Sequence, residues 1–128
     1  MSLNKNMRVV IVDDYTTMLR ILRNLLRQLE IANVDEANDA ETAFAAMQRQ
    51  APDLIISDWN MVPMTGLDLL RKVRADGKLR HIPFIMVTAE SKTENVIAAK
   101  QAGVSNYIVK PFNSETLKGK IAGVLGQF

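Results

Sequence analysis

Five polar side chains directly follow short apolar runs, which places residue types with useful chemistry at comparable positions. The runs and the residues that follow them are Val9–Val12 with Asp13 and Asp14, Leu54–Ser57 with Asp58, Phe84–Val87 with Thr88, and Tyr107–Val109 with Lys110. Clustered carboxylates repel one another and are held ionised by a cation. Because the donors are oxygens, with no Cys in the chain and no His nearby, the set favours a hard ion, Mg²⁺ before Zn²⁺.

The apolar runs predict the elements that bring these side chains together. Short, continuous runs rich in Val and Ile are typical of strands buried on both faces, as in a parallel sheet. The carboxyl ends of parallel strands share one edge, and ligands of open α/β sheets bind there. We therefore expect the three Asp, the Thr and the Lys to converge at one edge of a sheet.

The segments between the runs have helical periodicity or turn chemistry. Residues 15–29 carry Met18, Leu22, Leu25, Leu26 and Leu29 on one helical face. Residues 33–37 alternate and predict an edge strand. A helix is expected to begin at Asn38–Glu41 and to end at about Gln50. Capping boxes at 65–68 and 91–94 predict the starts of two more helices, and Gly103 is expected to end the second of them. The last helix is expected to begin near Asn113 or Ser114. The order is β-α repeated five times, which predicts a three-layer α/β sandwich with right-handed crossovers.

The composition indicates a small globular protein. The chain has 128 residues, 48% of them apolar, which suits one domain over residues 7–128. Residues 1–6 are polar and are expected to be an extension, in part a cloning remnant. A net charge of +2 does not by itself predict nucleic-acid binding, and no apolar run is long enough to span a bilayer or form a signal peptide. We expect a cytoplasmic protein.

These residues together resemble the receiver domain of two-component response regulators. Asp13-Asp14, Asp58, Thr88 and Lys110-Pro111 occupy the matching strand ends, and the resemblance covers the chain from about Met7 onward. The stretches 57–61, 86–90, 101–103 and 107–112 are most similar to the chemotaxis members of the family. The resemblance implies a flavodoxin-like fold with a five-stranded parallel sheet of order 2-1-3-4-5.

The resemblance also implies a magnesium site. Asp14 and Asp58 would ligate Mg²⁺ directly, together with the backbone carbonyl of Asn60, and Asp13 would hold a metal-bound water. The family's usual Pro after Met61 is replaced by Val62, with Pro63 one position later. This departure affects the loop after the acceptor and not the acceptor chemistry.

Three residues are implied in phosphoryl transfer. Asp58 would become an aspartyl phosphate, Lys110 would pair with one phosphoryl oxygen, and Thr88 would donate a hydrogen bond to another. A carboxylate is a competent nucleophile, and phosphoryl transfer depends mainly on positioning and cations. Tyr107 would be an aromatic switch, and the Lys110–Pro111 peptide would be cis.

The implied function is that of a stand-alone response regulator and not of an enzyme with an external substrate. The donor would be a phosphohistidine kinase, because the chain has no nucleotide-binding motif. The phosphorylated form would bind a target, most simply the flagellar motor switch, on the face of the fourth helix, fifth strand and fifth helix. A phosphatase is a further possible partner, and a monomer is expected. The alternatives are a phosphorelay intermediate or phosphate sink, and a phosphatase-type enzyme, which would want an acid where Asn60 stands.

Other features have plainer interpretations. The Arg20, Arg23 and Arg27 stripe is expected to be a solvated helix face, and His81 an exposed loop residue. Gly119, Gly123 and Gly126 are expected to face outward from the last helix, which they weaken by about 1 kcal/mol each relative to Ala.

Overall fold

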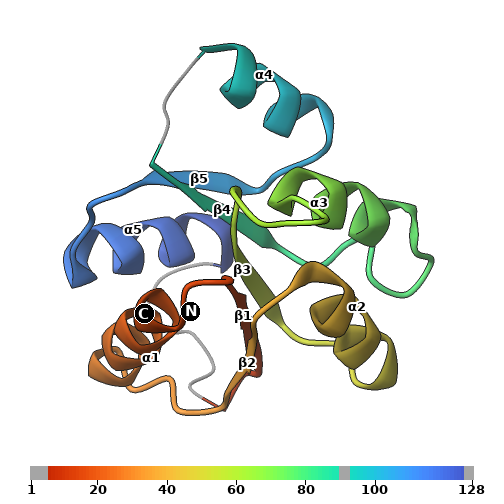
Figure 1. Ribbon diagram of the computed structural model, residues 1–128. Helices are drawn as coiled ribbons and strands as arrows, with labels where there is room; N and C mark the ends of the chain where they lie inside the picture. The colour runs from red at the N-terminus through yellow and green to blue at the C-terminus, as the bar shows by residue number, and fades with distance from the viewer. Residues whose placement is uncertain (1–5, 90–92, 126–128) are drawn as a thin grey trace.

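Strands and helices alternate along the chain (Figure 1). The computed structural model describes residues 6–89 and 93–125. The elements are β1 (Val9–Val12), α1 (Thr16–Gln28), β2 (Val34–Ala37), α2 (Ala40–Arg49), β3 (Leu54–Asp58), α3 (Gly66–Ala75), β4 (Phe84–Thr88), α4 (Thr93–Gln101), β5 (Asn106–Val109) and α5 (Ser114–Leu125). All strand pairs are parallel, and their order is β2-β1-β3-β4-β5. The predicted three-layer α/β fold and strand order are confirmed.

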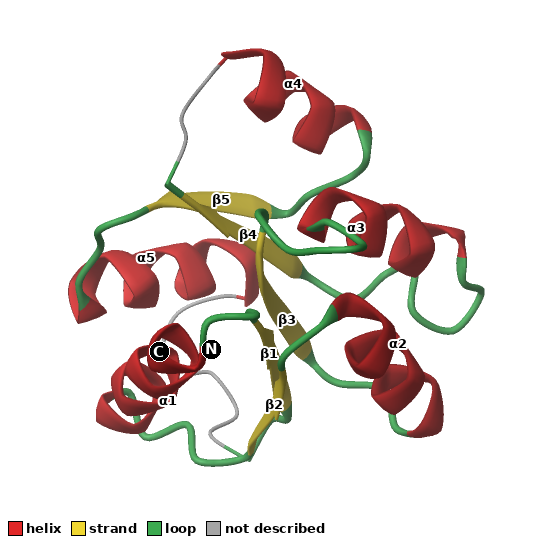
Figure 2. Cartoon of the chain, viewed as in Figure 1, coloured by secondary structure: helices red, strands yellow, loops and turns green. Residues whose placement is uncertain are grey.

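Helices cover both faces of the sheet (Figure 2). The helices α1 and α5 lie on one face of the sheet, and α2 and α3 lie on the other. The helix α4 lies beyond the edge of the sheet formed by β5 and its neighbour β4. Two apolar clusters fill the spaces between the layers, one under α1 and α5 and one under α2 and α3. In the ranges that the structure describes, no helix is both long enough and apolar enough to cross a bilayer.

The predicted strand burial is correct for the centre of the sheet and wrong for β5. Every residue of β1, β3 and β4 is buried. In β5 only Ile108 is fully buried, and the Val109 side chain is 41% exposed. The reason is position: β5 is an edge strand, and α4 leaves part of its face uncovered. A Val/Ile run alone does not distinguish an edge strand from a central one.

The helix α1 differs in detail from its expected pattern. Leu19, Leu22 and Leu26 are its buried side chains, so the apolar face is centred closer to Leu19 than expected. Arg23 is not simply solvated, because its guanidinium donates to the Glu36 carboxylate and, at 3.0 Å, to the Val34 carbonyl. This arginine therefore ties α1 to the edge strand β2.

The helix starts follow the predicted capping chemistry. Asp39 accepts a hydrogen bond from the Thr42 amide at 2.7 Å, and Asn113 accepts one from the Thr116 amide at 2.9 Å. Thr65 and Asp68 form a reciprocal capping box at the start of α3. The capping box expected at 91–94 lies mostly outside the described residues. His81 is exposed, as are Gly119 and Gly123, whereas Gly126 lies outside the described range.

Arg74 joins three segments at the end of the sheet opposite the strand carboxyl ends. Its guanidinium donates to the carbonyls of Gly103 at 2.8 Å, Arg80 at 3.0 Å and Ile82 at 2.7 Å. Burial lowers the pKa of this guanidinium from its usual value, although it stays charged at neutral pH. Gly103 has φ 92°, so it ends α4 with the left-handed residue that the sequence predicts.

Candidate functional site

The strand register explains why the predicted site residues meet. Val12 of β1 is paired with Ser57 of β3, so Asp13 follows one strand where Asp58 ends the other. Asp58 is in turn paired with Val87, which immediately precedes Thr88 at the end of β4. Thr88 is paired with Val109, so Lys110 leaves β5 beside it. The Lys110 amide donates to the Thr88 carbonyl at 2.7 Å, which fixes this corner of the sheet edge.

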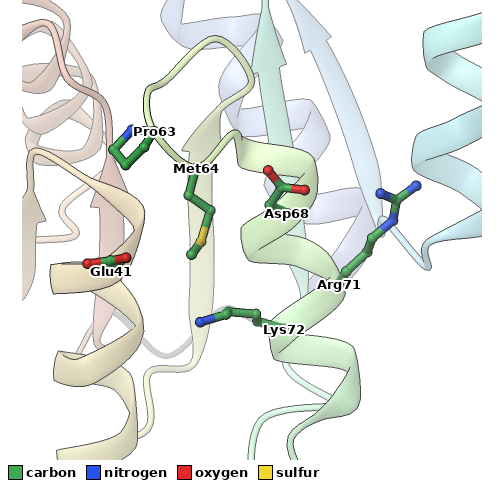
Figure 3. Close-up of a pocket in the computed structure, with 6 residues that line it drawn as sticks. All are labelled: Glu41, Pro63, Met64, Asp68, Arg71 and Lys72. Atoms are coloured by element: carbon green, nitrogen blue, oxygen red, sulfur yellow. The ribbon is translucent and has the colours of Figure 1, made fainter.

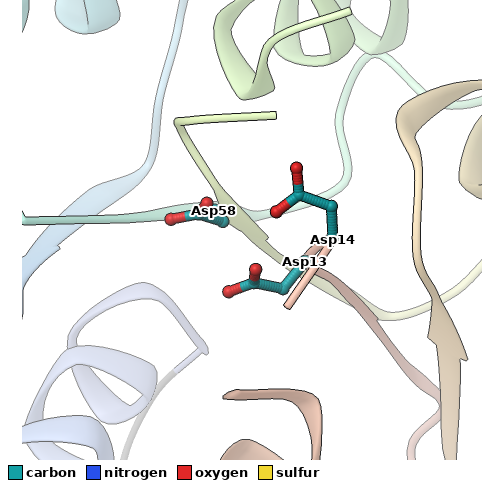
Figure 4. Close-up of side chains that lie close together, drawn as sticks. All are labelled: Asp13, Asp14 and Asp58. Carbon is teal, nitrogen blue, oxygen red and sulfur yellow. The ribbon is translucent and has the colours of Figure 1, made fainter. Parts of the chain in front are cut away.

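The three carboxylates face a common space (Figure 4). One oxygen from each of Asp13, Asp14 and Asp58 lies within 4.8 Å of the others. The Lys110 ammonium donates to the Asp58 Oδ1 at 3.0 Å and lies 3.6 Å from the Asp13 Oδ2. Asp13 and Asp58 are buried, while Asp14 is exposed. The site thus has two buried acids, one acid open to solvent and one cation.

Burial raises the pKa of the Asp13 carboxyl, and repulsion from Asp58 and Asp14 raises it further. The Tyr15 amide, which donates to the Asp13 Oδ1 at 2.9 Å, and Lys110 act in the opposite direction. These two favourable contacts do not fully offset the cost of burying the charge. The Asp13 carboxylate would therefore be stabilised by a further cation.

The donor set fits a magnesium ion. The Asp13 Oδ2 is buried and accepts no hydrogen bond from any described group. Three carboxylates face one ammonium, so a divalent ion would balance the charge of the cluster. All the donors are oxygens, which suits a hard ion. The residues present are thus compatible with the predicted ion.

The remaining predicted residues lie at the carboxyl ends of the strands or in the loops that follow them. Thr88 is buried at the carboxyl end of β4, and Asn60 is exposed two residues after Asp58. The Lys110–Pro111 peptide is cis as expected, and Val62–Pro63 is cis as well. Glu90, which the sequence predicts to control phosphoryl lifetime together with Asn60, lies outside the described residues.

The aromatic residues beside the site contact each other. The rings of Trp59 and Tyr107 pack edge to face with centroids 6.4 Å apart. Trp59 follows the predicted acceptor, and Tyr107 lies in β5, so this contact links the site to the edge of the sheet. The sequence gave no sign that the two rings touch.

A pocket of about 450 Å³ lies beside the site, between α2 and α3 (Figure 3). Its lining residues are Glu41, Pro63, Met64, Asp68, Arg71 and Lys72. The Met64 side chain lies between Glu41 on α2 and the α3 residues Asp68 and Lys72. A second pocket of about 280 Å³ shares Glu41, Pro63 and Met64. The lining of both pockets excludes the clustered carboxylates, so these hollows are separate from the acidic site.

Two hydrogen-bond donors that support the site were missed in the sequence analysis. The Tyr15 amide that holds Asp13 is a backbone donor, which a sequence pattern does not reveal. The Ser57 hydroxyl donates to the Asp58 carbonyl at 3.0 Å from a buried position. A Ser inside an otherwise apolar run was the available signal, because a buried hydroxyl requires a partner.

An acidic cluster with two buried acids and a paired lysine, at the carboxyl edge of a 2-1-3-4-5 parallel sheet, defines the receiver class of signalling protein. Residues 9–122 match the response regulator receiver domain family, and the chain belongs to that family. Within it the chain is CheY-like. It is 52% identical over 119 residues to chemotaxis protein CheY-3 of Vibrio cholerae, covering 93% of this chain and 92% of that protein.

Three further comparisons agree. The chain is 52% identical over 115 residues to chemotaxis protein CheY of Pseudomonas aeruginosa, covering 90% of this chain and 93% of that protein. The crystal structure of Vibrio cholerae CheY4 superposes with a TM-score of 0.88 at 33% identity, covering 94% of this chain and 99% of that one. A receiver domain of a histidine kinase from Syntrophus aciditrophicus gives a TM-score of 0.84 at 28% identity, covering 93% of this chain and 89% of that one.

Proposed function

We propose that Asp58 accepts a phosphoryl group from a phosphohistidine on a partner kinase. The observation that carries this proposal is the buried Asp58 carboxylate with the Lys110 ammonium 3.0 Å away and two further acids at the same sheet edge. A carboxylate held beside a cation is both a nucleophile and part of a phosphoryl-binding site. The protein is a signalling receiver, and the chemistry at Asp58 is its own modification.

In the transfer step, an Asp58 carboxylate oxygen attacks phosphorus. The O–P bond forms while the P–N bond to the kinase imidazole breaks, and that nitrogen keeps the bonding electron pair. Lys110 moves from Asp58 to a phosphoryl oxygen, and the Thr88 hydroxyl donates to another. Asp13, Asp14, Asp58 and the Asn60 carbonyl would hold Mg²⁺, which supplies charge neutralisation. Hydrolysis of the acyl phosphate by water later restores the Asp58 carboxylate.

The acceptor is tested with a small phosphodonor. Acetyl phosphate with Mg²⁺ should add one phosphoryl group to the wild-type protein, detected by intact mass. Asp58→Asn should abolish labelling, because an amide is not a nucleophile here, while Asp53→Asn, immediately before the start of the same strand, should label normally. Stoichiometric labelling of Asp58→Asn at another acid would refute the assignment.

We further propose that the output is target binding on the face of α4, β5 and α5, with the flagellar motor switch as the target, from a cytoplasmic location. Chemotaxis is named for the relatives that are 52% identical, which supports this setting. The face offers exposed apolar side chains, with Ile97 at 49% and Val109 at 41% exposure. Lys100 and Lys120 on α4 and α5 add positive charge, and Lys92, which we also expect there, lies outside the described residues. An amphipathic target helix with acidic residues suits such a surface.

This output is tested by measuring the affinity of a motor-switch target segment with and without beryllofluoride. Beryllofluoride should tighten binding, and Lys100→Ala and Lys120→Ala should weaken it. Arg20→Ala on α1, outside the face of α4, β5 and α5, is the control and should have no effect. Equal affinity in both states would favour a phosphate sink, and loss of binding only with Arg20→Ala would move the output surface to α1.

A further inference from the structure

The loop between β3 and α3 is closed by hydrogen bonds to a single carbonyl. The Trp59 amide continues the sheet ladder by donating to the Val87 carbonyl at 3.0 Å. The Trp59 carbonyl accepts from the Met61 amide at 3.1 Å and from the Gly66 amide at 2.9 Å. The first residue of α3 is thus bonded directly to the residue after the acceptor. Asn60, the expected carbonyl ligand, lies inside this closed loop.

Gly66 is needed at this point for space and not for an unusual backbone conformation. Its φ is outside the left-handed region, and the residue is buried. A Cβ atom at Gly66 would lie 2.1 Å from the Asp58 carbonyl oxygen and 2.9 Å from the Met86 sulfur. The sulfur belongs to a flexible side chain that can move. The oxygen belongs to the backbone of the acceptor, so any Cβ there must push either β3 or α3 away.

The Asp58 carbonyl is held from a second side as well. It accepts the Ser57 hydroxyl at 3.0 Å, and its strand is paired on both edges with β1 and β4. If a side chain at Gly66 clashed with the Asp58 carbonyl, β3 would therefore stay in place. The start of α3, with the loop that precedes it, is the part that would shift.

We propose that Gly66 is a positioning residue for the phosphorylation site. By lacking a side chain, it lets the first turn of α3 rest on the Asp58 carbonyl, and its amide closes the loop that contains Asn60, whose carbonyl is the expected metal ligand. The inference rests on the proposed function, since it concerns how that site is held. In this inference, the absence of a side chain at Gly66 sets the distance between β3, which carries the acceptor, and the loop that would complete the metal ligands.

The size of the effect follows from the geometry. Relieving the contact in a Gly66→Ala variant requires a shift of about 1 Å, and a misplacement of that size can cost about 100-fold in rate. Loss of a group that orients metal ligands typically lowers metal affinity by about 10- to 100-fold. We expect Gly66→Ala to weaken Mg²⁺ binding by at least about 10-fold and to slow labelling by acetyl phosphate by a similar factor.

The experiment compares three variants with the wild type by calorimetric Mg²⁺ titration, acetyl phosphate labelling rate and urea unfolding. Gly119→Ala is the matched glycine control, because nothing lies within 4 Å of a Cβ built there. Thr65→Ala is the stability control, because it removes the capping hydroxyl of α3 without adding an atom near Asp58. Both controls should keep wild-type Mg²⁺ affinity to within about 2-fold, although Thr65→Ala should lower the urea midpoint.

The outcomes separate this inference from the proposed function. Wild-type protein that neither binds Mg²⁺ nor labels would refute the function. Wild-type activity with equal Mg²⁺ affinity in Gly66→Ala, or equal losses in Gly66→Ala and Thr65→Ala, would refute the role of Gly66. Amide hydrogen exchange of the wild type gives a further test if Gly66→Ala does not fold. The Gly66 amide should be protected like β3, and rapid exchange there would overturn the inference.

Discussion

Replacing Asp13 by Asn should stabilise the protein when Mg²⁺ is removed. The Asp13 carboxylate lies 3.6 Å from Lys110 and within 4.8 Å of the other two acids. At an effective dielectric constant of about 20, the lysine contributes about 4–5 kcal/mol of attraction and Asp58 about 3–4 kcal/mol of repulsion. The exposed Asp14 adds about 1 kcal/mol of repulsion through water. The Coulomb terms nearly cancel, which leaves the cost of burying the charge uncompensated.

The amide of Asn removes that cost while keeping the shape. Its carbonyl still accepts the Tyr15 amide, and its neutral NH₂ group, in place of Oδ2, no longer repels the Asp58 carboxylate. We expect a gain of about 1–2 kcal/mol in the free energy of unfolding in chelator at neutral pH. The pKa of Asp13 is raised in the folded state, so its protonated form stabilises the fold at low pH and that contribution is lost as the pH rises through the folded pKa. The difference between variant and wild type should therefore shrink as the pH falls toward about 4.

Urea unfolding with chelator and with saturating Mg²⁺ is the assay. Mg²⁺ should stabilise the wild type strongly and the Asp13→Asn variant much less, because the ion binds the folded state through this acid. Asp14→Asn is the control: it should also lose Mg²⁺ stabilisation but gain less stability in chelator, since its carboxylate is exposed. An Asp13→Asn variant that is less stable than the wild type in chelator would refute the electrostatic reasoning.

Three further outcomes are expected. Arg74→Ala should lower the free energy of unfolding by about 2–3 kcal/mol in urea titration, because three carbonyls lose a charged donor, while the exposed neighbour Arg71→Ala should be nearly neutral. Gly119→Ala should raise the free energy of unfolding by about 1 kcal/mol in the same titration, because the residue lies in an exposed helix interior with open space around it. A lower free energy of unfolding would show that the glycine is needed. Asn60→Arg should slow loss of the Asp58 phosphoryl group, followed by mass spectrometry after donor removal, because a bulky basic side chain hinders the attacking water. An unchanged decay would remove Asn60 from control of lifetime.

Much of the fold was predictable because local chemistry and global topology agree in this chain. The capping residues Asp39, Thr65 and Asn113 mark helix starts where the structure has them. The apolar runs mark the strands, and the site residues follow from the rule that parallel strands end together. Contacts between distant segments were not predictable. Nothing in the sequence pattern indicates that Arg74 reaches the carbonyl after α4, since that depends on register and packing.

The site was predictable to the level of side chains but not of their supports. Asp13, Asp58 and Lys110 occupy informative positions, and the structure brings them together. The groups that hold them are a backbone amide at Tyr15, a buried hydroxyl at Ser57 and a missing side chain at Gly66. Such supports act through geometry and carry little compositional signal. The exposure of β5 was missed for a similar reason, because strand composition does not say which neighbour covers it.

The shallow seating of α4 has an evolutionary consequence. Among the described residues of this helix only Ala99 is fully buried, whereas β1, β3 and β4 are buried throughout. Substitutions on α4 therefore carry a small folding penalty, while substitutions in the buried strands β1, β3 and β4 carry a large one. Lineages that inherit this fold are free to diversify the helix that we propose meets targets while the phosphoryl chemistry stays fixed. Duplicated copies of such a gene are expected to diverge first in the target that they bind and last in the phosphorylation that activates them.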